Sequence, residues 1–268
     1  MNPLRNLAGA IGFLTRVPVG ERAHGVALPR TLPWFPAVGL LVGLVVGIVA
    51  AVVAAAVDPL TGAAVAVAVG ALVTGGLHED GLADTADGFG GGWTPEERLA
   101  IMDDSRQGTF GVLAVVASVA IRVAAVAHLA GDRTGPAGPW TVVLAAPVAH
   151  LAARAWAVAA LVTTPPARGE GLGWTAGAPG GRWASSVLAL ALGVWAVVAV
   201  LVAGPVPAVA ALAAGGAATL AVVSLSRRKI GGLTGDVAGA IEQLAEMAAL
   251  TAMAAVAGPG RPWLAGLW

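Results

Sequence analysis

Seven apolar stretches, each close to the length of a membrane-spanning helix, constrain this chain more than any other feature. A hydrocarbon core of roughly 30 Å needs about 20 apolar residues in a helix. The sequence therefore predicts an all-α fold, a polytopic membrane bundle of about seven transmembrane helices in which residues 1–268 form a single domain. A weaker stretch, Leu4–Val19, is typical of an interfacial or re-entrant helix. The seven stretches cover residues 34–57, 60–77, 109–130, 140–162, 184–203, 206–225 and 237–257.

The scarcity of charge supports a membrane location. Charged residues make up 11% of the chain, against about 25% in water-soluble proteins. A soluble domain of this length would still need a wetted surface, so we expect lipid to cover much of the exterior. The net charge is zero and gives no indication of nucleic acid as a partner. The chain has no cysteine, which excludes disulfides, cysteine-ligated zinc, iron–sulfur clusters and a thiol nucleophile.

The distribution of lysine and arginine predicts the orientation. Seven spans leave eleven of these residues on the side of the N-terminus and two, Arg133 and Arg261, on the other side. Cytoplasmic loops carry the excess of basic residues. We therefore expect a multi-pass protein of the bacterial cytoplasmic membrane, with the N-terminus and the acidic region 78–108 on the cytoplasmic side. The eleven are Arg5, Arg16, Arg22, Arg30, Arg98, Arg106, Arg168, Arg182, Arg227, Arg228 and Lys229.

The first polar motif, residues 75–88, reads Gly-Gly-Leu-His-Glu-Asp-Gly-Leu-Ala-Asp-Thr-Ala-Asp-Gly. Offsets of four and three place Asp80, Asp84 and Asp87 on one face of a helix, where like charges repel. Eight of the fifteen acidic residues lie within 79–104, with too few bases nearby to neutralise them. A divalent cation with oxygen ligands, above all Mg²⁺, would supply the counter-charge. The alternative is a solvated acidic loop, which the scarcity of charge elsewhere disfavours.

The second polar motif, residues 103–111, reads Asp-Asp-Ser-Arg-Gln-Gly-Thr-Phe-Gly. Arg106 offers a planar fork suited to phosphate oxygens. Ser105 lies just before the predicted start of a helix, where an anion can bind, and Asp104 could add a metal ligand. The alternative is a plain loop in which Thr109 caps the following helix.

The third polar motif, residues 227–239, has three bases, then a glycine-rich turn, then Thr234 and Asp236 at the start of the last span. A flexible loop with one carboxylate beside a helix start suits phosphate or metal-bound water. The three bases have a simpler interpretation as the cytoplasmic anchor of the preceding span.

Two arginines and two glutamates lie inside the predicted spans. Carboxylates within a membrane are costly and normally face the bundle interior. Glu242 and Glu246 are one helical turn apart, and we expect them to pair with Arg122 or Arg154 in a structural role.

The four histidines differ in their surroundings. His78 opens the acidic motif and is the candidate for substrate binding. His128 and His150 lie within apolar spans and are typical of hydrogen-bonded packing groups, and His24 falls in a loop.

Taken together, these motifs resemble the cobalamin synthase family, the adenosylcobinamide-GDP ribazoletransferases. The similarity runs in order along nearly the whole chain. One departure is Asp103, where the family usually has a basic residue; this makes Asp104 the carboxylate of the motif. The matching segments are residues 75–88, 101–111 and 231–236, together with 13–18 (Phe-Leu-Thr-Arg-Val-Pro) and 34–36 (Trp-Phe-Pro).

The resemblance implies a membrane-bound, Mg²⁺-dependent phosphotransferase. Its substrates would be adenosylcobinamide-GDP and α-ribazole or α-ribazole 5′-phosphate. The 5′ oxygen of the acceptor attacks the phosphate attached to cobinamide, GMP leaves, and adenosylcobalamin or its 5′-phosphate results.

This chemistry needs charge neutralisation and alignment more than covalent work. We assign catalytic roles to Asp84 and Asp87, with Asp87 as a further metal ligand or as the base that accepts the proton of the attacking hydroxyl. The predicted metal ligands are Asp80, Asp84, Asp87 and Asp104, and the predicted substrate-binding residues are His78, Ser105, Arg106, Thr234 and Asp236.

Two other classes compete with this interpretation. A transporter with an acidic ion pathway would place its charges near the bilayer midplane, whereas these lie in a predicted cytoplasmic connection. A lipid phosphotransferase of the CDP-alcohol kind would need the spacing Asp-Gly-x-x-Ala-Arg. That spacing is absent. The motif requires an arginine four residues after its glycine, whereas the charged residue here, Asp84, stands three residues after Gly81.

Overall fold

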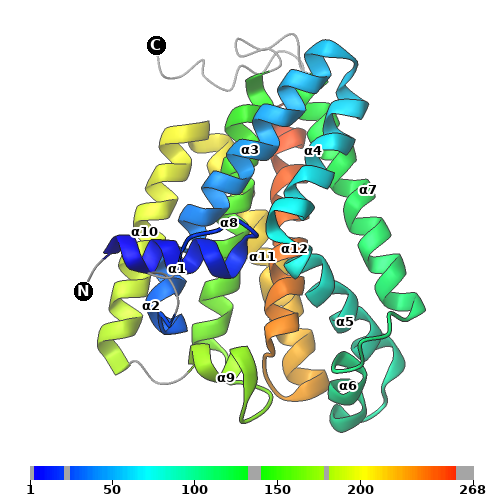
Figure 1. Cartoon of the computed structure of the whole chain (residues 1–268), viewed down its shortest axis with the longest axis vertical. Coiled ribbons are helices and arrows are strands. Elements are labelled where there is room, and N and C mark those ends of the chain that lie inside the picture. Colours follow the sequence, from blue (N-terminus) through cyan, green and yellow to red (C-terminus); the bar gives the residue numbers. More distant parts are fainter. Residues whose placement is uncertain (1–2, 21–24, 132–139, 178–180, 258–268) are drawn as a thin grey trace.

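The computed structural model describes residues 3–20, 25–131, 140–177 and 181–257. Among these residues every regular element is helical (Figure 1), apart from one isolated bridge between Pro166 and Leu233. The predicted all-α fold is therefore confirmed. Positions used in the sequence analysis that lie outside the described residues are Arg22, His24, Arg133 and Arg261, and the side chain of Arg182 is likewise not described.

Long helices occupy each of the seven predicted apolar stretches. They are α3 (Phe35–Ala56), α4 (Pro59–Thr74), α7 (Thr109–Gly131), α8 (Thr141–Thr163), α10 (Gly181–Ala203), α11 (Pro205–Ile230) and α12 (Gly235–Val256). The short helices are α1 (Pro3–Leu14), α2 (Leu28–Thr31), the 3-10 turn η2 (Leu32–Trp34), α5 (Leu77–Gly91), α6 (Pro95–Met102) and α9 (Gly171–Gly177).

The predicted number of seven spans is not confirmed. Four helical segments, Leu28–Ala56, α7, α8 and α11, are each long and apolar enough to cross a membrane. The pair α4 and α5 would be a fifth only if joined across a 90° bend. The apolar part of α10 that can be assessed, Gly193–Ala203, is shorter than a span. A multi-pass membrane protein follows from the four segments alone.

The predicted second stretch, residues 60–77, does not form one continuous helix. The helix α4 ends at Thr74, and α5 starts at Leu77 in a new direction. Gly75 and Gly76 make this turn with φ values of 70° and 71°, a left-handed conformation that glycine adopts at no steric cost. The polar motif therefore forms a helix of its own, which this turn separates from the apolar helix α4.

Helix α8 is the centre of the bundle. In its most apolar window 78% of the residues are buried, against 28% in α7, so α7 offers much more of its surface to the exterior. The helix α8 packs mainly against α3 and α12. Helix α1 lies across the long helices, and α5, α6 and α9 gather toward one end of the bundle (Figure 1).

Glycines allow α3 to approach α8 backbone to backbone. A Cβ atom on Gly43 would lie 2.5 Å from the carbonyl oxygen of Ala146, and one on Gly47 would lie 2.8 Å from that of Val142. Small residues four apart permit such close packing in membrane helices. The central pair of the bundle therefore depends on the absence of these side chains.

We expect Gly43→Ala to lower the apparent melting temperature of the detergent-purified protein. The added methyl group must push α3 away from α8, and overpacking of this kind costs about 1–3 kcal/mol. Gly193→Ala in α10 is the matched control, because nothing lies within 4 Å of the added Cβ. That control should melt no lower than the unsubstituted protein, since alanine favours helix over glycine. Equal melting temperatures for both variants would contradict this account of the α3–α8 contact.

Candidate functional site

Two glycines bring the first and third polar motifs together where α5 crosses α12. A Cβ atom on Gly81 would lie 2.8 Å from the carbonyl oxygen of Asp236 and 3.2 Å from the Cα of Gly239. Only residues without side chains fit at this crossing. The carboxylates of α5 therefore lie beside the first turn of α12, and the two motifs, from opposite halves of the sequence, share one site.

Asp84 is the half-buried member of this group. Burial, reinforced by the charges of Asp80 and Asp236, raises the pKa of the Asp84 carboxyl to about 6. Asp80 is exposed beside it, and Asp236 is partly buried on the opposite helix. Three carboxylates from two helices thus act on one another across the Gly81–Gly239 crossing.

Asp87 has a different environment from Asp80 and Asp84. It is buried, and its two carboxylate oxygens accept hydrogen bonds from the backbone N–H groups of Gly108 (2.7 Å) and Gly111 (2.8 Å). These N–H groups lie at the start of α7, where no intrahelical partner exists for them. Asp87 therefore anchors the second polar motif to α5. Its predicted roles as metal ligand or base stay predictions.

The loop before α7 holds an internal ion pair. Asp104 accepts hydrogen bonds from the backbone N–H of Arg106 (3.0 Å) and from its Nε (3.0 Å) and Nη2 (2.5 Å). The side-chain bond from Arg106 lowers the pKa of Asp104 to about 2. Arg106 is 87% exposed, and Ser105 beside it is exposed too. The fork predicted to bind phosphate therefore points outward with its own carboxylate as partner.

Arg168, which was expected only as one of the basic residues on the cytoplasmic side, reaches this site through a bridge between two loops. Ala167 N–H donates to Leu233 O and Leu233 N–H donates to Pro165 O, both at 2.9 Å. Arg168 Nη1 then donates to Asp103 at 2.6 Å, and its Nη2 lies 3.9 Å from Asp236. No local pattern signals this contact, because the paired groups are far apart in sequence.

Thr234 lies at the start of α12, and His78 lies in the first turn of α5. Thr234 caps α12, accepting a hydrogen bond from the N–H of Val237 (3.2 Å) and donating one to Asp236 (3.2 Å). His78 is buried, with its Nδ1 3.6 Å from Glu242. His78 therefore supports the α5–α12 contact, whereas Thr234 stabilises the start of α12.

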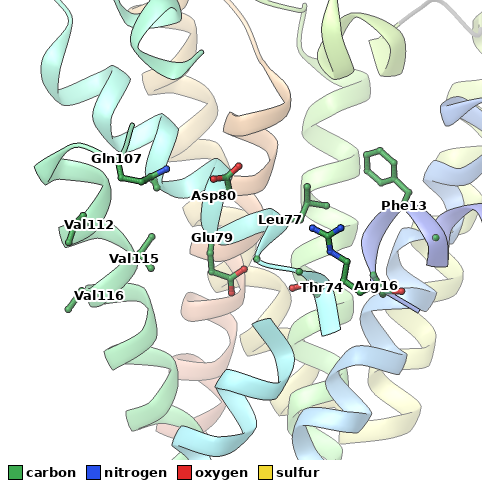
Figure 2. Close-up of a pocket in the computed structure, with 15 residues that line it drawn as sticks. Phe13, Arg16, Thr74, Leu77, Glu79, Asp80, Gln107, Val112, Val115 and Val116 are labelled. Atoms are coloured by element: carbon green, nitrogen blue, oxygen red, sulfur yellow. The ribbon is translucent and has the colours of Figure 1, made fainter. Parts of the chain in front are cut away.

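Two cavities flank Asp80. The larger, about 800 Å³, lies between α1, the α4–α5 bend and α7. Figure 2 shows Arg16 and Phe13 on one side of it and the valines of α7 on the other, with Glu79 and Asp80 between. The smaller, about 210 Å³, lies between α1, α3, α5, α8 and α12. His78, Asp80 and Asp236 all line the smaller cavity, so three predicted site residues share it.

A network of ion pairs lies next to the site, in the interior of the bundle. Arg154 contacts Glu242 at 2.6 Å, and Arg122 lies 3.0 Å from Glu79 and 3.5 Å from Glu246. The predicted pairing of the two span carboxylates with Arg122 and Arg154 is thus confirmed. His150, at 2.8 Å from Glu246, is the polar packing group that the sequence predicted.

Potential metal ligands come closest together in this network. Among the described residues, the group of three whose ligand atoms all lie within 4.8 Å of one another is His150, Glu242 and Glu246. Two guanidinium groups already compensate these carboxylates, so an added cation would be repelled. The predicted ligands Asp80, Asp84, Asp87 and Asp104 do not reach that mutual proximity and would have to move closer to share one ion. Their assignment stays a prediction.

These features define a multi-pass, all-helical membrane protein with a carboxylate site on short polar helices at one end of its bundle. Residues 6–254 match the family model described as cobalamin-5-phosphate synthase. Similar proteins include the adenosylcobinamide-GDP ribazoletransferases of Bradyrhizobium diazoefficiens (43% identical over 95% of each chain) and Sinorhizobium medicae (43%, over 93% of this chain and 95% of the other). The one from Ralstonia pickettii is 40% identical over 92% and 95%. No solved structure gives a significant match. The chain belongs to the cobalamin-5-phosphate synthase family, as its motifs predicted.

We expect Asp87→Asn to destabilise the protein in the absence of any substrate. An asparagine amide would set an N–H group against the N–H of Gly108 or Gly111 and lose one acceptor. An unsatisfied buried donor costs about 1–3 kcal/mol. The measurement is the apparent melting temperature in detergent. Asp80→Asn, at an exposed position on the same helix, is the control and should melt like the unsubstituted protein. An unchanged melting temperature for Asp87→Asn would remove its anchoring role.

Proposed function

We propose that this protein transfers the cobinamide phosphate of adenosylcobinamide-GDP to α-ribazole or α-ribazole 5′-phosphate and releases GMP. The observation that carries the proposal is the carboxylate group at the α5–α12 crossing in a chain of the cobalamin synthase family. In this reaction a bond forms between a ribose hydroxyl oxygen of the acceptor and the cobinamide phosphorus, and the bond from that phosphorus to the GMP oxygen breaks. The attacking hydroxyl is not the 5′ hydroxyl that was expected, because α-ribazole 5′-phosphate has its 5′ oxygen already esterified and keeps that phosphate in the product. The hydroxyl proton passes to a carboxylate.

Asp84 suits the role of proton acceptor. A base works best when its pKa lies near the working pH, and burial beside Asp80 and Asp236 raises the pKa of Asp84 to about 6. Asp87 remains an alternative base, but its oxygens already accept two backbone hydrogen bonds. We therefore propose that Asp87 chiefly positions the loop that precedes α7.

The donor set fits Mg²⁺, which binds through one or two carboxylates and keeps several waters. Asp80 is exposed and Asp84 half-buried, so both are open to a hydrated ion, with Asp87 and Asp104 as further proposed ligands. Bound Mg²⁺ would neutralise charge on the diphosphate and on the leaving GMP. Arg106 would exchange Asp104 for the diphosphate, which would free the Asp104 carboxylate for the metal.

The remaining predicted contacts belong to the same proposal. Ser105 beside Arg106 would bind phosphate oxygens, and Thr234 and Asp236 would contact substrate from α12. His78, which lines the smaller cavity, would contact the acceptor. All of these lie within reach of the α5–α12 crossing or of the loop before α7.

We also propose that the site faces the cytoplasm in the bacterial cytoplasmic membrane. The basic end of α11 lies at the same end of the bundle as the acidic motif. Lys229 Nζ donates to the carbonyl of Phe89 at 2.7 Å, and Arg98 Nη1 donates to the carbonyl of Lys229 at 2.9 Å. Basic residues of this kind mark the cytoplasmic side. The partners are the two substrates and the lipid bilayer.

Incubation of the purified protein with Mg²⁺, adenosylcobinamide-GDP and α-ribazole should release GMP, measured by chromatography. Asp84→Asn should reduce turnover by about 10²-fold or more, because it removes a base and a ligand, and EDTA should stop the reaction. Asp58→Asn is the matched control, since Asp58 lies at the end of α4 far from the polar motif and caps that helix through Leu60 and Thr61. It should retain turnover.

Three results of this assay would each contradict a different part of the proposal. Absence of GMP together with activity toward a CDP-linked lipid, or with ion flux in proteoliposomes, would overturn the proposed function. Full turnover of Asp84→Asn would remove Asp84 from the site. Indifference to EDTA would remove the metal.

The Mg²⁺ concentration needed for half-maximal GMP release should rise as the pH falls through about 6. The raised pKa means that Asp84 takes up its proton at a higher pH than an ordinary aspartate, and a protonated carboxyl is a poor ligand. Above this pH the requirement should be constant. The measurement is a series of Mg²⁺ titrations of the initial rate, with Asp58→Asn expected to give the same profile. A requirement that stays constant down to about pH 4.5 would show that Asp84 is not a ligand.

A further inference from the structure

Three residues form a wall common to the two cavities beside the site. Phe13, Leu77 and Asp80 each line both the cavity of about 800 Å³ and the cavity of about 210 Å³. Ligand pockets in proteins enclose roughly 300–1,000 Å³. The larger cavity falls within this range, whereas the smaller suits a compact group. Two unequal compartments that meet at a carboxylate match a reaction between two substrates of unequal size.

We propose that the smaller cavity binds the base of the acceptor nucleoside, while the larger cavity binds the nucleotide end of the donor. This assignment rests on the proposed function and names where each of its substrates binds. The attacking hydroxyl of the acceptor and the donor diphosphate would then meet at the shared wall, next to Asp80 and one helical turn from Asp84.

The smaller cavity has the lining that a flat, apolar ring system requires. Phe35, Ala157 and Leu161 line it from α3 and α8, and Phe13 lines it from α1. The rings of Phe13 and Phe35 are stacked, with their centroids 5.6 Å apart and an interplanar angle of 18°. Aromatic side chains in this arrangement offer edges and faces for a further planar ring. The base of α-ribazole, a fused aromatic ring, is such a group.

A buried donor in the same cavity provides the polar contact. Arg154 lines the cavity and is 2% exposed, and its Nε–H has no hydrogen-bond partner. Its Nη1 is used by Glu242 and by the carbonyl oxygen of His150. A buried donor without an acceptor is costly. The base of α-ribazole has one ring nitrogen that is not attached to the ribose, and this nitrogen would accept from the N–H once the Arg154 side chain turns to expose its Nε to the cavity.

The position of the acidic groups orients the nucleoside. Asp80 and Asp236 line the smaller cavity on its α5 and α12 sides, whereas Arg154 and Leu161 lie on α8. With the base toward α8, the ribose points to the two carboxylates, which accept hydrogen bonds from its hydroxyl groups. The attacking hydroxyl is thereby directed toward Asp80, one helical turn from Asp84, the proposed proton acceptor.

The larger cavity has the features expected for a phosphate-bearing donor. Arg16 points into it (Figure 2), and its backbone N–H donates to the carbonyl of Val73 at 2.8 Å, which fixes its position. A side chain on Gly75 would collide with the Arg16 guanidinium, so the bend between α4 and α5 leaves room for this group. The guanidinium fork fits phosphate oxygens. Gln107 and Val115 line the opposite side from the second polar motif and α7.

The test compares the two Michaelis constants of GMP release in variants that narrow one cavity at a time. Ala157→Leu narrows only the smaller cavity, and Val115→Phe narrows only the larger. We expect Ala157→Leu to raise the KM for α-ribazole by about tenfold or more while the KM for adenosylcobinamide-GDP stays within about twofold. Val115→Phe should do the reverse. Val162→Leu, exposed on α8 outside both cavities, is the control and should change neither constant.

A second variant covers the case in which Ala157→Leu fails to fold. Leu161→Ala enlarges the smaller cavity without a clash and should also raise the KM for α-ribazole alone. A rise in the KM for the donor alone in either α8 variant, an equal rise in both constants, or no change in folded protein would overturn the assignment. These outcomes leave the proposed function intact, because they are measured on protein that releases GMP. Absence of GMP from the unsubstituted protein would instead refute the proposed function.

Discussion

Pairing of charges inside the bundle is the constraint on which the arrangement of this protein depends. A carboxylate in a lipid-covered helix is tolerated only when a partner compensates it. Here Arg154 contacts Glu242, and Arg122 contacts both Glu79 and Glu246. These pairs join α5, α7, α8 and α12, so no one of the four helices can slide or rotate without leaving a charge unpaired. The network thereby fixes the register in which the polar motifs meet.

The geometry of the site depends on that register. Once α5 and α12 are held together, the Gly81–Gly239 crossing sets Asp84 beside Asp236. Asp87 then fastens the start of α7 to the same helix through Gly108 and Gly111. The ion pairs of the interior therefore determine where the carboxylates of the site lie. They hold together groups that would otherwise be separated by their mutual repulsion.

The sequence predicted the apolar helices well, because hydrophobic length is a local property. It also indicated that Glu242 and Glu246 need Arg122 and Arg154, since an unpaired charge in lipid is too costly. It placed the end of the second stretch at residue 77, although the pair Gly75–Gly76 is a readable signal for a break at Thr74. By length and composition, four helical segments of the structure qualify directly as spans. The prediction of seven spans counted every apolar stretch as a span, whatever the length of its helix.

The site was less predictable for a physical reason. Helical spacing placed Asp80, Asp84 and Asp87 on one face, but it could not show that Asp87 turns to the N–H groups of another helix. It likewise gave no sign that Arg168 contacts Asp103, because that contact depends on the pairing of two loops near Leu233. A single sequence shows the helical periodicity of each segment, whereas contacts between distant segments arise only after the helices have packed.

The contact between Arg168 and Asp103 has a consequence for how this family can vary. A basic residue at the position of Asp103 would face Arg168 with a like charge. These two positions should therefore covary across the family, each sign at one tending to select the opposite sign or a neutral residue at the other. The positive charge near Asp236, which Arg168 supplies here, would then come from position 103 in some chains and from position 168 in others, and the local electrostatic balance would be preserved.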